Sequence, residues 1–345
     1  MTAHDIRRRS LLGLSLAAAA ATQCRAAAQI ALAMPMTADM PTILVAGPAD
    51  SPVAHWARLL RAPLAQGLGA PDELQLRFAG GRDGVTGVNQ FDARAMPDGA
   101  QAVLFPGSVG LALLAGDSRV RFDARHLVPV LACAASGIMA LPGGGIAPRP
   151  RPVRLAITPA HAPDAAALLA LDLLNVPVLP VHVAGDKLDA VRVGAADAVF
   201  VSGQDQGARL AALAQFGIAP AFSINPPVAG APDRRPGLPD MADLLQTRHR
   251  ADPLAGAWDG LATAGLMEFV LAIPRQSPAA SIQRWRTACG AWLASRESAA
   301  ERDNPGFHAV EGEMAAGLLA GMQVAEPART ELRAWFGARL NWRPA

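Results

Sequence analysis

Several residue types that would indicate a particular kind of protein are rare or absent in this chain of 345 residues. Tyrosine is absent, lysine occurs only at Lys187, and charged residues make up 17% of the chain. The positive charge is therefore almost all arginine, and in a chain rich in alanine, glycine and proline it indicates compositional bias rather than a nucleic-acid-binding surface. A hydrophobic fraction of 51% excludes an intrinsically disordered chain.

Cysteine is also scarce, which excludes a disulfide-rich scaffold. The three cysteines are Cys24, Cys133 and Cys289, and no two of them have the spacing of zinc ligands. The seven histidines are scattered, and none lies in a recognisable metal-binding motif. We therefore expect neither a metal nor another cofactor. Cys133 and Cys289 lie in apolar segments, where buried thiols are more usual than a disulfide.

The first 28 residues are predicted to be an export signal. Arg7-Arg8-Arg9 precedes Ser10 and an apolar run that is too short to span a bilayer comfortably, and Ala26-Ala27-Ala28 offers a cleavage site. The arginines resemble a twin-arginine signal, although an ordinary secretory signal or an uncleaved anchor would also fit. We expect cleavage after Ala28, a linker over residues 29–41 and a periplasmic protein. Without residues 1–28 the chain has 27 basic and 28 acidic residues, so its positive net charge belongs to the signal.

The stretch Thr42–Leu60 introduces the organisation of the rest of the chain. An apolar run, Ile43-Leu44-Val45, stops at Gly47-Pro48, and apolar residues then recur at spacings of three and four after Ser51-Pro52. This pattern predicts a strand, a loop and a helix, with serine as N-cap and proline at the first helical position. Loops of this kind form ligand sites at the carboxyl ends of parallel strands.

Strand-like and helical segments continue to alternate after this stretch, which predicts an α/β fold with two mainly parallel sheets flanked by helices. We expect strands at 74–78, 102–105, 153–157, 178–183, 198–201 and 220–224, and helices at 88–96, 163–174, 206–216, 278–294, 307–320 and 327–335. Two longer apolar segments, 126–141 and 260–273, would cross between lobes. The predicted domains are lobe 1, residues 42–142 and 260–345, and lobe 2, residues 143–259.

No complete catalytic set is visible. Gly107-Ser108-Val109-Gly110 resembles a nucleophile elbow, but Pro106 stands where the motif requires its first glycine. Gly80-Gly81-Arg82-Asp83-Gly84 lacks the lysine and the hydroxyl of a P-loop. A protein that is not an enzyme is therefore favoured, and an exported hydrolase using Ser108 is the alternative.

Small, polar loops recur at the expected strand ends, and together they predict a pocket for a small anionic molecule. Serine and threonine would donate hydroxyl hydrogen bonds there, glycines would expose backbone N–H groups, and a histidine could add charge on protonation. The candidate ligand-binding residues are Ala49, Asp50, Ser51, Pro52, Gly107, Ser108, Val109, Thr158, His161, Gly185, Asp186 and Ser202.

A collinear set of short motifs resembles the periplasmic substrate-binding proteins of tripartite tricarboxylate transporters, the TctC or Bug family. The matching segments, in order, are VAGPADSPVAHWARLL at 45–60, AGGRDGVTG at 79–87, Pro97-Asp98-Gly99, Val128-Pro129-Val130, Gly194-Ala195-Ala196-Asp197, Leu238-Pro239-Asp240 and Trp258. The resemblance extends from about residue 42 to the end of the chain.

This resemblance implies a two-lobed clamshell that holds a small carboxylated solute in the cleft between its lobes, largely through backbone N–H groups and bridging waters. It further implies delivery of the solute to membrane transporter subunits. We expect a monomer, and the composition gives no reason to expect a nucleic-acid partner. A periplasmic receptor that serves a sensor is an alternative. The chain departs from the family at Pro48-Ala49-Asp50, where paired glycines are common, and at Val183-Ala184-Gly185, where the family has Tyr-Lys-Gly. The first loop should therefore be stiffer and more acidic than in its relatives.

Overall fold

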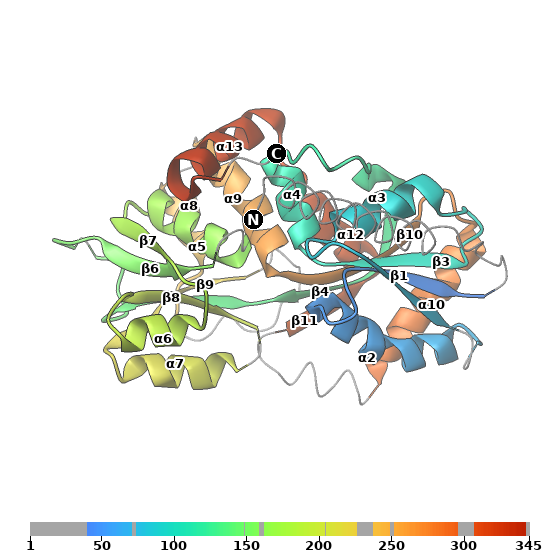
Figure 1. Ribbon diagram of the computed structural model, residues 1–345, viewed down its shortest axis with the longest axis horizontal. Coiled ribbons are helices and arrows are strands. Elements are labelled where there is room, and N and C mark those ends of the chain that lie inside the picture. Colours follow the sequence, from blue (N-terminus) through green and yellow to red (C-terminus); the bar gives the residue numbers. More distant parts are fainter. Residues whose placement is uncertain are drawn as a thin grey trace, which may run out of the picture. The chain divides into compact units, whose positions relative to one another are not determined.

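The computed structural model describes residues 40–70, 74–147, 149–158, 162–203, 205–225, 237–248, 252–295 and 307–342. The predicted export signal and most of the predicted linker lie outside these residues. Met40–Ala345 is a single compact unit, and the structure contains a six-stranded and a five-stranded sheet (Figure 1). Within the described residues, no helix is long and apolar enough to cross a membrane.

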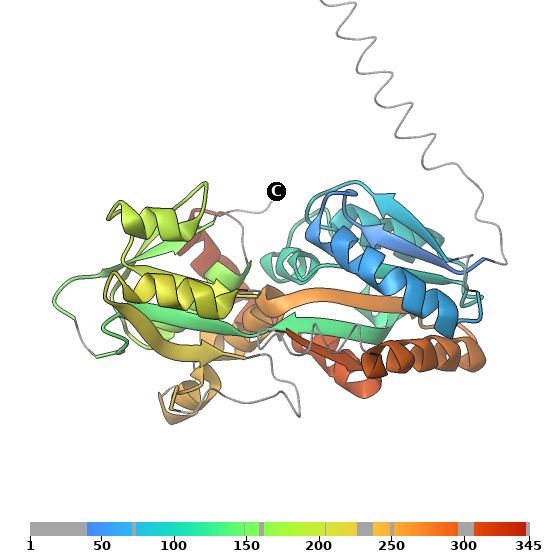
Figure 2. The same cartoon turned by 90° about the horizontal axis from the view of Figure 1, so that it is seen from below.

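The first sheet has the strand order β11-β4-β10-β3-β1-β2. Its strands are β1 (Thr42–Ala46), β2 (Gln75–Ala79), β3 (Gln101–Phe105), β4 (Leu127–Ala135), β10 (Met267–Pro274) and β11 (Phe307–Glu311). β1 is parallel to β2 and β3, whereas β10 runs antiparallel to both β3 and β4 (Figure 2). The return of the chain through β10 therefore makes the sheet mixed rather than mainly parallel.

Helices cover both faces of the first sheet. α2 (Pro52–Gly67) and α10 (Ala279–Ala294) pack together on one face, where the fully buried Trp285 donates its indole N–H to the carbonyl of Gly99 at 2.9 Å. The other face is covered by α3 (Val85–Arg94), α4 (Ser108–Ala115) and α12 (Gly312–Gly321). A short 3-10 helix, η1 (Ala124–His126), leads into β4.

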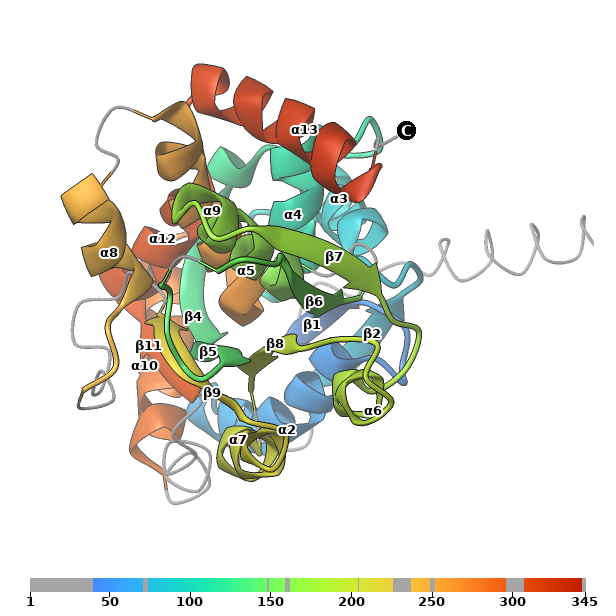
Figure 3. The same cartoon turned by 90° about the vertical axis from the view of Figure 1, so that its left-hand side faces the viewer.

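The second sheet has the order β7-β6-β8-β5-β9 and is also mixed. Its strands are β5 (Gly137–Pro142), β6 (Val153–Ile157), β7 (Val178–His182), β8 (Ala198–Ser202) and β9 (Ile218–Ile224). β6 is parallel to β7 and β8, and β5 is antiparallel to β8 and β9. α5 (Ala162–Leu173) covers one face, and α6 (Lys187–Arg192) and α7 (Gln206–Ala214) cover the other (Figure 3). α8 (Met241–Arg248) lies beside β9.

The chain changes sheet at Ser136, between β4 and β5. The predicted lobe boundary at residue 142 therefore lies at the end of β5, one strand after this change of sheet. Residues 127–141 are buried almost throughout, so their apolar pattern does not mark the crossing. The Gly/Pro cluster after Pro142 connects β5 to β6 within the second sheet. The residue bounds of the two lobes stay a prediction.

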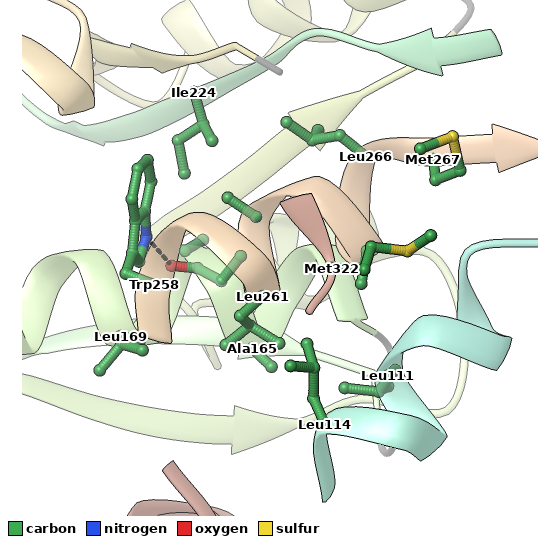
Figure 4. Packing of buried hydrophobic residues seen from close by; sticks show 14 of the residues in the cluster. Leu111, Leu114, Ala165, Leu169, Ile224, Trp258, Leu261, Leu266, Met267 and Met322 are labelled. Atoms are coloured by element: carbon green, nitrogen blue, oxygen red, sulfur yellow. Dashed lines mark hydrogen bonds between the residues drawn. The ribbon is translucent and has the colours of Figure 1, made fainter. Parts of the chain in front are cut away.

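α9 (Pro253–Leu266) joins the cores of the two sheets. It packs against α5 beside the second sheet, and against α4 beside the first. Figure 4 shows leucines of α4, α5 and α9 meeting in this cluster, with Trp258 donating its indole N–H to a backbone carbonyl. That carbonyl belongs to Ala166, at 3.0 Å. Only residues 260–266 of the predicted apolar crossing are helical, and Met267–Pro274 is β10.

The last helix, α13 (Glu326–Leu340), also contacts elements of both sheets. Arg339 forms a two-pronged ion pair with Asp172 of α5, both bonds measuring 2.8 Å, and Trp335 donates its indole N–H to the same carboxylate. The guanidinium of Arg333 lies against Gly116, which ends α4 in a left-handed conformation and has no side chain to obstruct it. α13 therefore contacts α4 through Arg333 and α5 through Arg339.

Most predicted elements are present, and one predicted helix is wrong in its first part. Residues 307–320 were predicted to be helical, but Phe307–Glu311 forms strand β11 and only residues from Gly312 onward are helical. β11 pairs with β4, and this long-range pairing outweighs the local helical pattern. Cys133 and Cys289 are buried as expected. Burial, with the Glu311 carboxylate adding to it, raises the pKa of the Cys289 thiol.

Candidate functional site

The loop between β1 and α2 is folded by its own hydrogen bonds. Ser51 caps α2, where its hydroxyl accepts from the N–H of Ala54 at 3.3 Å and donates to the carbonyl of Pro48 at 2.6 Å. The Ser51 proton predicted for a ligand is thus already engaged within the loop. Ala49, Asp50 and Pro52 are exposed, so they are the members of this loop that a solute could reach.

The loop between β3 and α4 is packed rather than open. The N–H of Gly107 donates to the carbonyl of Met267 at 3.2 Å, and the N–H of Val109 donates to the carbonyl of Pro106 at 3.1 Å. The Ser108 hydroxyl donates to the carbonyl of Asp83 at 3.0 Å. A serine whose proton is held by a carbonyl is not paired with a general base, so the geometry does not favour the hydrolase alternative. These donors fix neighbouring loops instead of presenting themselves to a ligand.

The loops of the second sheet are joined by a buried ion pair that sequence reasoning missed. Asp164, in the first turn of α5, accepts the N–H of Thr158 at 2.8 Å through one oxygen and the ammonium of Lys187 through the other. The Asp164 side chain is 1% exposed and that of Lys187 is 14% exposed. The pair thereby holds the β6–α5 loop to the start of α6. The single lysine and the aspartate after Ala162-Pro163 were visible in the sequence, but their partnership was not.

The remaining predicted residues of the second sheet lie at its carboxyl edge. Gly185 is exposed with open space around it, and Asp186 caps α6 by accepting the N–H of Leu188 at 2.9 Å. Ser202 is the last residue of β8. His161 lies outside the described residues.

Contacts between aromatic rings and the β8–α7 loop bring the two sets of loops together. A Cβ placed on Gly203, the residue after Ser202, would lie 3.8 Å from the Phe307 ring of β11. That ring contacts Trp56 of α2, with ring centroids 5.6 Å apart. Gly203 therefore lies near Phe307, which in turn packs on Trp56 in the second turn of α2. Since β6 is parallel to β8, the carboxyl edge of the second sheet faces the first sheet.

Polar residues at the crossing between the sheets form a further group that sequence reasoning did not identify. The Ser136 hydroxyl and Nε2 of His308 are hydrogen-bonded at 2.8 Å, and Gln206 donates to the carbonyls of Ser136 and Val201. His308 is 7% exposed, and burial lowers the pKa of its imidazole. The group therefore connects the crossing between β4 and β5 to α7 and β11.

Two cavities lie elsewhere. One of 360 Å³ is bordered by α4 and by Met322–Val324, and one of 280 Å³ is bordered by Phe91, His126 and Arg275. Neither is lined by a predicted ligand-binding residue. These two cavities, and a third of 510 Å³ bordered by α2 and α10, therefore do not mark the candidate site, which is defined by the strand ends.

Comparison with solved structures identifies the architecture. A TctC solute-binding protein from Polaromonas superimposes with a TM-score of 0.57 over 87% of this chain and 97% of its own, at 14% sequence identity. The chain has the fold of the TctC-type periplasmic solute-binding proteins. An R. palustris protein solved with adipate has a TM-score of 0.51 at 17% identity, covering 87% of this chain and 97% of its own. A further structure, described as a periplasmic transporter, has a TM-score of 0.50 at 14% identity, with 87% and 95% covered.

The structural matches confirm the predicted two-lobed α/β fold class, with mixed sheets. No protein-family model matches the chain, and no curated protein sequence does. At these identities the likeness concerns the fold, so each binding residue has to be argued from this chain's own geometry.

Two predicted site glycines should respond in opposite ways to substitution by alanine. A Cβ on Gly107 would lie 2.1 Å from the carbonyl oxygen of Ala264 and 2.6 Å from that of Met267. A Cβ on Gly185 would have no atom within 4 Å. Gly107→Ala should lower the free energy of unfolding by roughly 3 kcal/mol or more, and Gly185→Ala by about 0.5 kcal/mol or less. Urea denaturation measures both, and equal effects would contradict the packing described at Gly107.

The buried histidine predicts a dependence of stability on pH. Because its pKa in the folded protein is below the unfolded value of about 6.5, the unfolded chain binds more protons and stability falls as pH drops below about 6.5. His308→Gln, which can still hydrogen-bond Ser136, should flatten this part of the profile between about pH 6.5 and 5. The matched control is His55→Gln, at an exposed position of α2. A profile unchanged by His308→Gln would show that other groups cause the slope.

Proposed function

We propose that this protein is an exported, non-enzymatic solute-binding protein that captures a small organic anion in a cleft between its two sheets. It delivers this solute, a carboxylate, to the subunits of a membrane transporter and works as a periplasmic monomer. The observation that carries the proposal is that small loops follow the carboxyl ends of parallel strands in both sheets, in a fold shared with TctC-type proteins.

Helix N-termini supply the attraction for an anion. α2, α4, α5 and α7 all begin just after the carboxyl end of a parallel strand. Each N-terminus carries a partial positive charge and N–H groups without partners inside the helix. A carboxylate binds at such a place without an arginine clamp. The adipate in the R. palustris structure with this fold supports carboxylates as the first class of solute to test.

The binding residues that we propose are those that remain accessible. In the first sheet they are Ala49, Asp50 and Pro52, beside Ser51, whose hydroxyl proton is donated within the loop. In the second sheet they are Thr158, Gly185, Asp186 and Ser202. His161, which lies outside the described residues, stays in the proposal as a sequence-based prediction. Gly107, Ser108 and Val109 contribute by shaping the floor of the site, since their donors bond to the protein.

A thermal-shift screen tests the proposed function. Succinate, adipate, citrate, glutamate and benzoate would each be added at millimolar concentration, and a solute that binds the folded protein raises its melting temperature by mass action. We expect at least one carboxylate to give a concentration-dependent rise, with the corresponding uncharged amide as control. If none of these anions shifts the melting temperature, carboxylate capture is wrong.

Asp50 should limit how much negative charge the site accepts. Its carboxylate is exposed, and within the described residues it takes part in no ion pair, so it repels an anion held at the start of α2. Asp50→Gly should favour citrate over adipate by about 2- to 5-fold relative to the unaltered protein, the size typical of an exposed charge pair.

Isothermal titration calorimetry measures this preference. Glu331→Gln, which removes an exposed acidic charge on α13, is the control for net charge. If Asp50→Gly and Glu331→Gln give the same ratio of affinities, Asp50 does not face the solute.

A further inference from the structure

We infer that the ammonium of Lys187 binds the carboxylate of the solute and that Asp164 positions this ammonium beneath the second-sheet loops. The inference rests on the proposed function and names the charged group that selects the solute there. Lys187 was not among the residues predicted from the sequence, which suggested backbone and hydroxyl donors and a histidine that could add charge on protonation.

The position of the pair is defined by the sheet. β6 and β7 are parallel and in register up to Ile157 and His182, so the loops that follow them leave from the same edge. α5 and α6 start from these loops on opposite faces of the sheet (Figure 3). The ion pair between Asp164 of α5 and Lys187 of α6 therefore spans the carboxyl edge of β6, the edge that faces the first sheet.

The ammonium of Lys187 has more N–H donors than its bond to Asp164 uses. An ammonium carries three N–H groups, and Asp164 is its hydrogen-bond partner among the residues that the structure describes. Both carboxylate oxygens of Asp164 accept hydrogen bonds, because the second oxygen accepts the N–H of Thr158. With 14% of its side chain exposed, Lys187 can offer its remaining donors to a bound carboxylate without leaving Asp164.

The chemistry of lysine suits this arrangement. Every other basic residue in the chain is arginine, whose planar fork would be taken up by a single carboxylate. An ammonium is a compact charge with rotatable donors, so two carboxylates can share it. Gly185, two residues before Lys187, has open space of its own, since a Cβ there would find no atom within 4 Å. The N-terminus of α5 adds a favourable field for the extra negative charge.

A purely structural ion pair is the competing explanation, and the two explanations predict different signs for one substitution. If the pair only fixes loops, removing either partner should weaken binding to a similar extent. If Lys187 binds the solute, Asp164→Asn should strengthen binding, because the ammonium no longer shares its charge with a second carboxylate. Asparagine keeps an oxygen that can accept the N–H of Thr158.

The experiment measures adipate, succinate and citrate affinities by calorimetry at low temperature, on variants shown to be folded by circular dichroism. Lys187→Met should weaken the affinity for the tightest of these anions by about 10- to 100-fold, the loss expected for a charge-assisted hydrogen bond. Asp164→Asn should tighten it by about 2- to 10-fold. Arg192→Met, at the exposed and ion-paired last residue of α6, is the matched control and should leave affinity unchanged.

The possible outcomes separate this inference from the proposed function. Anion binding by the unaltered protein, combined with equal weakening by Lys187→Met and Asp164→Asn, would overturn the role of Lys187 and leave the proposed function standing. Absence of binding by the unaltered protein to all three anions would overturn both. If Lys187→Met does not fold, Lys187→Gln replaces it, because glutamine can still hydrogen-bond to Asp164.

Discussion

The packing of α9 against helices of both sheets is the interaction on which the rest of the structure depends. α9 is apolar on nearly every side, and its Trp258 is buried against α5 with its N–H satisfied by Ala166. The end of α9 and the start of β10 also meet the loop after β3, because Gly107 approaches the carbonyls of Ala264 and Met267. One buried helix thus fixes both the relation of the two cores and the floor of the candidate site.

Parallel strands and their loops could be predicted from the sequence because their signals are local. Val153–Ile157 was predicted at its observed bounds, and β1 with the Ser51 cap of α2 was predicted from an apolar run, a turn and a Ser-Pro pair. Strand β11 and the change of sheet at Ser136 were not predicted. Both depend on which distant strand is the partner, and periodicity within a segment carries no information on this.

The candidate site shows the same limit at the level of side chains. The loops were placed correctly at the strand ends, but the hydroxyls of Ser51 and Ser108 turned out to bond within the protein. Asp164 and Lys187 are separated by 23 residues and meet only because β6 and β7 are neighbours. In the same way, Ser136 and His308 are 172 residues apart. Residue types were readable from the sequence, whereas their pairing required the fold.

The late position of several structural elements in the chain constrains how the protein can fold during synthesis. β10 is inserted between β3 and β4, and the tie that α13 makes between α4 and α5 uses the last part of the chain. A ribosome that has made the first 250 residues has therefore released neither the strand that completes the first sheet nor the helix that secures it. Contacts between such distant residues slow folding, since long loops must close first. The native arrangement of the two sheets can then form only after β10 and α13 have been translated.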